Sequence, residues 1–203
     1  IEQPQSILDI GAGTGLLALM LAQRSDAMTI DAMEIDESAY IECTENFEAS
    51  PWGDRLFCYH ASFEEFFTEM DEPYDLIISN PPFYPTDYKT PEKARNTARF
   101  SDALPPKQLL EGVNRLLAVE GKFSVILPYT ESESFITLAA TFGLFPQQIT
   151  HTRGNAQSEL KRSMMLFARA PQPSYPIDIL TIEKERGVYT EAYKALTKEF
   201  YLK

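Results

Sequence analysis

Three glycines at alternate positions follow the first apolar run of the chain, which extends from Ser6 to Ile10. They lie in the segment Asp9-Ile10-Gly11-Ala12-Gly13-Thr14-Gly15, and a run of helix-forming residues begins at Leu16. Glycine allows positive φ angles and lets a ligand approach the backbone closely. In an open α/β sheet, a turn of this kind lies at the carboxyl end of a strand, where ligands bind. The segment is therefore predicted to be a ligand-binding turn.

Spacing and neighbouring acids narrow the choice of ligand. The GxGxG pattern differs from the GxGxxG pattern of dinucleotide-binding turns. Asp9 would repel a pyrophosphate but attract an ammonium group. Glu34 ends the second apolar run, and an acid at that place accepts hydrogen bonds from ribose hydroxyls. These features favour S-adenosylmethionine over a nicotinamide dinucleotide, for which no catalytic Tyr-Lys set is evident; a purely structural glycine turn beside a surface acid is the remaining alternative.

A second candidate site is the segment Asn80-Pro81-Pro82-Phe83-Tyr84, which follows the apolar run from Tyr74 to Ser79. The prolines fix φ and remove two backbone donors, so the turn presents acceptors and an aromatic side chain. The Asn80 side-chain oxygen and the Pro81 carbonyl could each accept one N–H of a planar amine and free its lone pair for methyl transfer. Phe83 could stack on a displaced base, while Tyr84 is either a second wall of that site or a core residue.

Apolar runs alternate with helical patterns along most of the chain, which predicts a mostly parallel sheet with helices on both faces. Strands are expected at 6–10, 28–35, 55–60, 74–79, 121–127, 147–152 and 163–169, with a further strand-like run at 177–183. Helices are expected at 16–24, 37–48, 63–70, 107–118, 133–142 and 190–200. The proline-rich stretch 80–106 interrupts the pattern after the Asn-Pro-Pro-Phe turn, and such a segment is more often functional than incidental.

These motifs in this order resemble class I S-adenosylmethionine-dependent methyltransferases that methylate amino groups. The chain is most similar to the bacterial family of tRNA(Val) adenine-N6 methyltransferases, which modify adenine 37 beside the anticodon. The resemblance runs nearly end to end, through LDIGAGTGLLALMLAQR at 8–24, SPWGDR at 50–55, YDLIISNPPFY at 74–84 and TEAYKALTKEFYL at 190–202. It implies a Rossmann-like, seven-stranded sheet with an antiparallel last strand, and a monomer or weak oligomer.

The resemblance also implies roles for individual residues. The cofactor would be held by Asp9, Gly11, Gly13, Glu34, Ile35, Ser62, Phe63 and Asn80, and the catalytic turn would comprise Asn80, Pro81, Pro82 and Phe83. Ser62 stands where many relatives have an Asp that accepts from the cofactor adenine, and a hydroxyl is a weaker acceptor. We expect residues 1–170 to form the methyltransferase domain and 171–203 a strand–helix appendage packed on it. Because relatives carry a basic arm before the first strand, we also expect such an arm to precede Ile1.

The charge is unevenly distributed along the chain. The formal net charge is −12, which taken alone argues against a polyanionic partner. Residues 1–84 contain two basic and 17 acidic side chains, whereas residues 85–203 contain 16 basic and 13 acidic ones. We predict phosphate contacts in the second part, from Arg95, Arg99, Lys161 and Arg162, with Tyr84 also on the RNA side. Ordinary solvated charge is the alternative for each of these residues.

Composition excludes several other classes of protein. The hydrophobic content of 44% and charged content of 24% are those of a globular chain, and no apolar run is long enough to cross a bilayer. Cys43 and Cys58 are too few for a disulfide framework, so we expect reduced thiols and a cytoplasmic location. His60 and His151 lack metal-ligand spacing, so no metal is expected.

Two other kinds of function remain open on the sequence alone. The same amino-methyl chemistry could act on rRNA guanine N2, DNA adenine N6 or a release-factor glutamine. A catalytically silent S-adenosylmethionine-binding module is the other alternative, against which the intact Asn-Pro-Pro-Phe turn argues.

Overall fold

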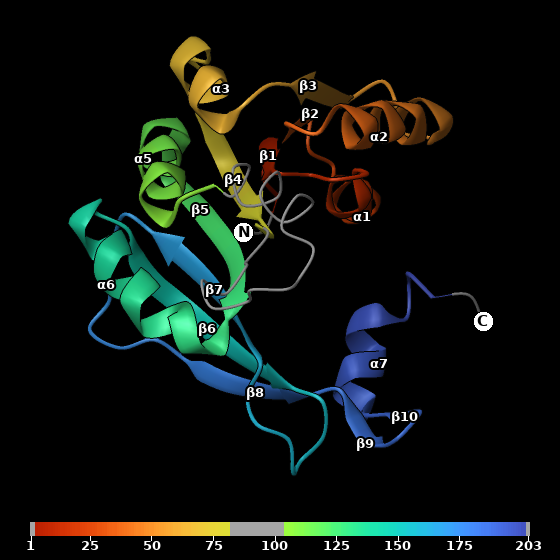
Figure 1. The fold of residues 1–203 in the computed structure, drawn as a ribbon, viewed down its shortest axis with the longest axis vertical. Coiled ribbons are helices and arrows are strands. Elements are labelled where there is room, and N and C mark those ends of the chain that lie inside the picture. The colour runs from red at the N-terminus through yellow and green to blue at the C-terminus, as the bar shows by residue number, and fades with distance from the viewer. Residues whose placement is uncertain (1–2, 82–103, 202–203) are drawn as a thin grey trace, which may run out of the picture. The chain divides into compact units, whose positions relative to one another are not determined.

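The computed structural model describes residues 3–81 and 104–201 (Figure 1). The chain forms two compact units, residues 1–123 and 124–203. Strand β5 (Leu117–Pro128) begins in the first unit and ends in the second.

The first unit alternates strands and helices, as the sequence pattern predicts. Its elements are β1 (Ser6–Ile10), α1 (Leu16–Arg24), β2 (Thr29–Glu34), α2 (Glu37–Ala49), β3 (Leu56–His60), α3 (Phe63–Glu69), β4 (Tyr74–Ser79), α5 (Pro106–Leu116) and the start of β5. The strands are ordered β3-β2-β1-β4-β5. β1 pairs in parallel with both β2 and β4, and β2 pairs in parallel with β3. The carboxyl ends of these four strands therefore open at one edge of the sheet.

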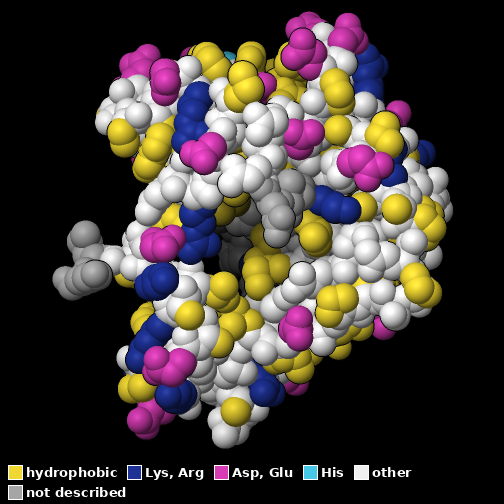
Figure 2. Space-filling model, turned by 180° about the vertical axis from the view of Figure 1, so that it is seen from behind, with side chains coloured by type: hydrophobic (Ala, Val, Ile, Leu, Met, Phe, Trp, Pro, Cys, Tyr) yellow, Lys and Arg dark blue, Asp and Glu magenta, His cyan; other side chains and the backbone are white. Residues whose placement is uncertain are grey.

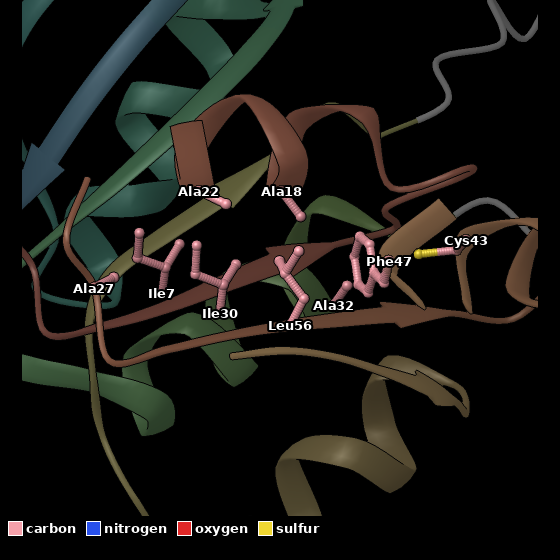
Figure 3. Packing of buried hydrophobic residues seen from close by; sticks show 9 residues of the cluster. All are labelled: Ile7, Ala18, Ala22, Ala27, Ile30, Ala32, Cys43, Phe47 and Leu56. Carbon is pink, nitrogen blue, oxygen red and sulfur yellow. The ribbon is translucent and has the colours of Figure 1, made fainter. Parts of the chain in front are cut away.

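On one face of β1, β2 and β3, the side chains paired across the strands become more polar toward the carboxyl ends of the strands. Ile7, Ile30 and Leu56 lie side by side in register and pack with Ala18, Ala22, Ala27, Ala32, Cys43 and Phe47 into a buried cluster (Figure 3). Because side chains alternate along a strand, the next row on this face is Asp9, Ala32 and Cys58. Glu34 and His60, which pair in register, end the face at the carboxyl edge. The apolar core thus supports a polar row at the edge where ligands bind.

The opposite face of the same strands is covered by α3. Tyr59, which alternates with Cys58 on β3, contacts Phe66 of α3 with ring centroids 5.3 Å apart. α3 packs in turn on α5, where a Cβ on Gly112 would come within 2.4 Å of the Phe63 ring. Helices α1 and α2 lie on the other side, so both faces of the sheet are covered (Figures 1 and 3).

Arg55, directly before β3, closes the carboxyl end of α1. Its guanidinium donates to the carbonyls of Ser25 and Ala27 at 3.0 and 2.7 Å, and to that of Ala22 at 2.6 Å. The last carbonyls of a helix lack intrahelical partners, and a cation near them is favoured by the helix dipole. Arg55 therefore has a structural role in the first unit.

The second unit contains the end of β5, η1 (Tyr129–Glu131), α6 (Ser132–Thr141), β6 (Phe145–Arg153), β7 (Arg162–Ala168), β8 (Ile177–Thr181), β9 (Glu183–Glu185), β10 (Val188–Tyr189) and α7 (Glu191–Thr197). Its strands are ordered β5-β7-β6-β8, and β9 and β10 form a separate antiparallel hairpin. β7 is antiparallel to β6, whereas β8 is parallel to it. The mostly parallel fold is confirmed, but the seven-strand prediction is corrected: the described residues contain an eighth strand in this sheet, because Ile177–Thr181 adds to the edge of β6.

Charged side chains of both signs are interspersed on the surface shown in Figure 2, rather than gathered in one large field of a single sign. No helix in the described part of the chain has the length and apolarity needed to span a membrane.

Candidate active site

The glycine turn between β1 and α1 has two different kinds of glycine. Gly11, Gly13 and Gly15 all have positive φ, at 71°, 57° and 81°. A Cβ on Gly11 or Gly13 would meet no heavy atom within 4 Å, so space for a ligand lies beside both. A Cβ on Gly15 would come within 2.5 Å of Phe47 Cε1 and 2.7 Å of Cys43 Sγ. Gly15 is thus required for packing against α2, a role that the motif alone does not reveal.

Glu34 joins this turn to the start of α2. Its carboxylate accepts N–H bonds from Gly13 at 2.8 Å, Ile35 at 2.8 Å and Asp36 at 2.9 Å. A carboxylate has about four lone-pair positions, so it retains capacity for a hydroxyl donor. Ile35, directly after it, is 46% exposed. Glu34 is thus in direct contact with the glycine turn, and Ile35 follows it along the chain.

Asp9 is a buried acid without a hydrogen-bond partner. Its side chain is completely buried, and neither carboxylate oxygen has a partner among the described residues. Burial raises the pKa of Asp9 to about 7; the nearby Ala18 N–H moderates the rise without completing a hydrogen bond, and the negative charge of Glu34 adds to it. An uncompensated carboxylate under a glycine turn fits an amino-acid-bearing cofactor, because an ammonium group would supply the missing charge.

We expect this arrangement to make the binding of S-adenosylmethionine depend on pH. With a pKa of about 7, the ionised fraction of Asp9 rises from about a tenth at pH 6 to about three quarters at pH 7.5. A cationic ligand favours the ionised form, so affinity is expected to rise about sixfold over this interval and to fall above about pH 8, where the ligand's own α-amino group loses its proton. Titration calorimetry at several pH values measures this, and Asp9→Asn should weaken binding at pH 7.5 and flatten the profile. A wild-type profile without slope, or an equal slope in the variant, would contradict this role of Asp9.

The turn between β3 and α3, predicted to face the cofactor adenine, is organised by a helix cap. The Ser62 hydroxyl donates to Glu65 at 2.7 Å, and the Ser62 N–H donates to the same carboxylate at 2.9 Å. The Phe63 side chain is 4% exposed and packs on Phe67 and at Gly112. The Ser62 hydroxyl thus bonds within the helix cap and the Phe63 ring packs in the core, while the cofactor contacts expected of these two residues stay predictions.

Two further side chains lie at this edge that sequence reasoning did not assign to it. His60, in register with Glu34, stacks on Tyr40 of α2 with centroids 5.0 Å apart and planes 17° apart. Its Nε2 lies 3.1 Å from the Ile35 carbonyl. The one sequence feature that could have indicated His60 is its position at the end of a strand. Its contact with Tyr40 could not be predicted, because the two residues are distant in sequence.

Asn80 begins the second motif and emerges beside the glycine turn. Ser79, its buried neighbour, pairs in register with Ile10 on β1, and the Ser79 hydroxyl donates to the Ile10 carbonyl at 2.9 Å. Consequently Gly11 and Asn80 are the first residues beyond two adjacent parallel strands. Asn80 is exposed and Pro81 is buried, so an anchored backbone presents the Asn80 amide.

The predicted RNA contacts divide into two groups. Lys161 and Arg162 are exposed in the second unit, where the Lys161 N–H donates to the Thr152 carbonyl at 2.8 Å and Arg162 pairs with Thr152. They thus lie beside the carboxyl end of β6. The other predicted residues, Pro82, Phe83, Tyr84, Arg95 and Arg99, fall outside the described residues.

Away from the glycine turn and Asn80, a metal site, a cavity or a reactive thiol among the described residues could each mark a further site. No group of three or more His, Cys, Asp or Glu side chains within residues 3–81 and 104–201 is arranged to hold a metal ion. A cavity of about 320 Å³ lies between α2 and β3, away from Asn80, and its lining comprises Thr44, Phe47, Glu48, Gly53, Leu56, Phe57, Cys58 and Tyr59. Cys43 and Cys58 are free thiols.

Comparison with known proteins places this geometry among methyltransferases. Residues 2–142 match the family model described as "Methyltransferase small domain". A Flavobacterium psychrophilum protein named tRNA1(Val) (adenine(37)-N6)-methyltransferase is 58% identical over 202 residues, which cover 100% of this chain and 86% of the relative. Proteins of the same name from Flavobacterium johnsoniae and Photorhabdus laumondii are 54% and 36% identical, covering 100% of this chain and 86% and 83% of theirs.

Solved structures share the fold at low sequence identity. A predicted O-methyltransferase from Agrobacterium tumefaciens superposes with a TM-score of 0.69 at 16% identity, over 95% of this chain and 88% of its own. TrmN from Thermus thermophilus has a TM-score of 0.58 at 17% identity, over 83% of this chain and 45% of its own.

Proposed function

Because this chain belongs to the family of tRNA1(Val) (adenine(37)-N6)-methyltransferases, we propose that it transfers a methyl group from S-adenosylmethionine to N6 of adenine 37 in tRNA(Val). The observation that carries the chemistry is the bond from the Ser79 hydroxyl to the Ile10 carbonyl. Because β4 and β1 are adjacent and parallel, the glycine turn and the Asn80 turn open at the same edge of the sheet, and this bond joins the two strands at that edge. A cofactor on the first turn and an amine on the second would then be neighbours.

Residues of this chain have three tasks in the proposed reaction. S-adenosylmethionine, when bound, supplies an electrophilic methyl group on a sulfonium. Asp9 would balance the ammonium group and Glu34 would accept from the ribose, with Gly11 and Gly13 leaving room above the turn. The Asn80 oxygen and the Pro81 carbonyl would each accept one N–H of the target amine, which localises the lone pair on nitrogen and aligns it. This is electrostatic preorganisation and needs no strong base.

The proposal also covers the partner. Phe83 would stack on the displaced adenine, with Tyr84 beside it, and Arg95, Arg99, Lys161 and Arg162 would contact phosphates. The exposed side chains of Lys161 and Arg162 at the end of β6 support the last of these roles. We further propose that the enzyme acts as a monomer or weak oligomer in the cytoplasm, where tRNA and its cofactor meet, and without a metal.

The test is to incubate the full-length enzyme with tritiated S-adenosylmethionine and total tRNA, and to identify the labelled nucleosides by mass spectrometry. We expect N6-methyladenosine in tRNA(Val), and no label in a tRNA(Val) transcript that carries guanine at position 37. Label in N2-methylguanosine, in DNA or in a release factor would instead support the other amino-methyl substrates. Cofactor binding by calorimetry without transfer to any of these substrates would point to a silent binding module.

A further inference from the structure

An aromatic pair, of which one ring is exposed and the other half-buried, lies at the carboxyl ends of β5 and β6 in the second unit. Tyr129 directly follows β5 and is 40% exposed. Its ring meets that of His151 on β6 nearly at right angles, with centroids 4.9 Å apart and planes 87° apart. In an edge-to-face contact, the ring that presents its edge has neither of its faces covered by the other ring. The pair thus offers an aromatic surface to a ligand.

Polar contacts fix this pair in place. His151 Nδ1 lies 2.9 Å from the hydroxyl of Ser163, which is fully buried on β7. The Tyr129 N–H donates to the Lys161 carbonyl at 3.0 Å, and the Lys161 N–H donates to the Thr152 carbonyl at 2.8 Å. The aromatic pair and the basic pair Lys161-Arg162 are therefore held on the same strand ends.

The charges around Tyr129 and His151 suit a phosphate-bearing ligand. Lys161 and Arg162 are exposed. Arg162 pairs with Thr152, so its side chain lies on the face opposite to His151, whereas Arg153 alternates back to the face of His151. The Arg153 guanidinium is oriented by the Thr181 hydroxyl at 2.9 Å and the Ala156 carbonyl at 3.0 Å. Residues 129–133 and 151–162 together contain three basic side chains (Arg153, Lys161 and Arg162) and three acidic ones (Glu131, Glu133 and Glu159), so the fit to a phosphate rests on the position of Lys161 and not on a net positive charge. Stacked bases with neighbouring phosphates, as in single-stranded RNA, combine these two requirements.

A second cluster of exposed aromatic residues has different surroundings. Tyr189 is also 40% exposed and contacts Tyr193 of α7. The nearby Lys184 and Lys194 both pair with Glu191, at 3.6 and 3.2 Å. Both lysines share this single carboxylate, and residues 183–194 contain three basic and three acidic side chains in all. Tyr129 is the better candidate because its N–H is bonded directly to the backbone of an exposed lysine, Lys161.

We propose that Tyr129 and His151 form a stacking platform for an unpaired nucleotide of the tRNA anticodon loop, with Lys161 holding a flanking phosphate. This inference rests on the proposed function, and it assigns to Tyr129 a contact with RNA outside the Asn80 turn. The contribution of stacking to RNA affinity depends little on salt concentration, whereas the contribution of phosphate contacts depends on it strongly. The two kinds of contact can therefore be separated in solution.

The test measures binding of full-length enzyme to tRNA(Val) across a salt series. Tyr129→Ala and Tyr129→Leu should each weaken binding roughly tenfold with an unchanged salt slope, and Tyr129→Phe should bind like the wild type. Lys161→Ala with Arg162→Ala should instead reduce the slope by about one to two. Tyr189→Ala, a change at an equally exposed tyrosine, should have no effect. Unchanged cofactor affinity and melting temperature establish that each variant is folded, and Tyr129→Leu preserves bulk should Tyr129→Ala fail this check.

Two outcomes would overturn the platform alone. Wild-type enzyme that binds and methylates tRNA(Val), together with Tyr129→Ala and Tyr129→Leu variants that bind it equally well, would show that the ring makes no contact. A Tyr129→Phe variant as weak as Tyr129→Ala would show that the hydroxyl, and not the ring, matters. If the wild type neither binds nor methylates tRNA(Val), the proposed function itself fails, and the platform fails with it.

Discussion

Replacing Asn80 with alanine is expected to lower the rate of methyl transfer by about 10²- to 10³-fold, the loss usual for one preorganised polar group at a reacting centre. The variant lacks the side-chain oxygen proposed to accept from the target amine, while the Pro81 carbonyl remains. The backbone should hold its place, because Ser79 still donates to Ile10 and Pro81 remains buried. Single-turnover methylation of tRNA(Val) measures the rate, and calorimetry measures cofactor affinity, which should fall far less than the rate because Asn80 is only one of the residues expected to hold the cofactor.

Ser79→Ala is the matched control for this experiment. It removes the hydroxyl that ties β4 to β1 without touching the amide of Asn80, so a smaller loss of rate is expected from looser positioning. If Asn80→Ala lost cofactor affinity as strongly as it lost rate, Asn80 would be a cofactor-binding or structural residue and the proposed role in the reaction would be wrong.

The second large effect concerns stability. Gly15→Ala is expected to lower the free energy of unfolding by about 2–5 kcal/mol, from a left-handed backbone that alanine tolerates poorly and from overpacking against Phe47 and Cys43. Gly11→Ala in the same turn has a similar φ but open space beside it, so only about 1–2 kcal/mol should be lost. Urea unfolding of cofactor-free protein compares the two directly.

The affinity for S-adenosylmethionine should also differ between the variants at these two glycines. A methyl group on Gly11 projects into the space left for a ligand, so this variant should bind S-adenosylmethionine more weakly than its stability suggests. Equal losses of stability in the two variants would contradict the assignment of Gly15 to core packing and of Gly11 to the ligand space.

The strands of the first unit could be predicted because apolar runs bounded by glycine, proline or acidic residues mark them locally. The order of Asp9, Glu34 and Asn80 along the chain likewise indicated where ligands would bind, since each follows or ends a strand. The start of β5 was missed: the strand begins at Leu117, directly after α5, in a stretch whose Val119 is 78% exposed. The β9–β10 hairpin was missed because Glu183 and Glu185 give no apolar alternation.

At Ser62, position in the sequence does not by itself define the hydrogen-bond partners of the side chain. Ser62 and Glu65 have the spacing of a capping box, and that signal was present in the sequence. The resemblance implies an adenine contact for Ser62, which stays a prediction, and the structure adds that the Ser62 hydroxyl donates to Glu65 in the helix cap. The stacking of His60 on Tyr40 and of Tyr129 beside His151 could not be predicted, because each joins residues brought together only by tertiary packing.

The capping of α1 by Arg55 has a consequence for the encounter with tRNA. Residues 1–84 contain only two basic side chains against 17 acidic ones, and the guanidinium of one of the two is bound to three backbone carbonyls. This part of the surface therefore repels a polyanion over roughly a Debye length, about 8 Å at physiological ionic strength. Encounters that present tRNA to the acidic part are disfavoured before contact. We therefore expect this repulsion to orient the tRNA before contact, because it lowers the rate of those encounters in which the tRNA approaches the acidic part first.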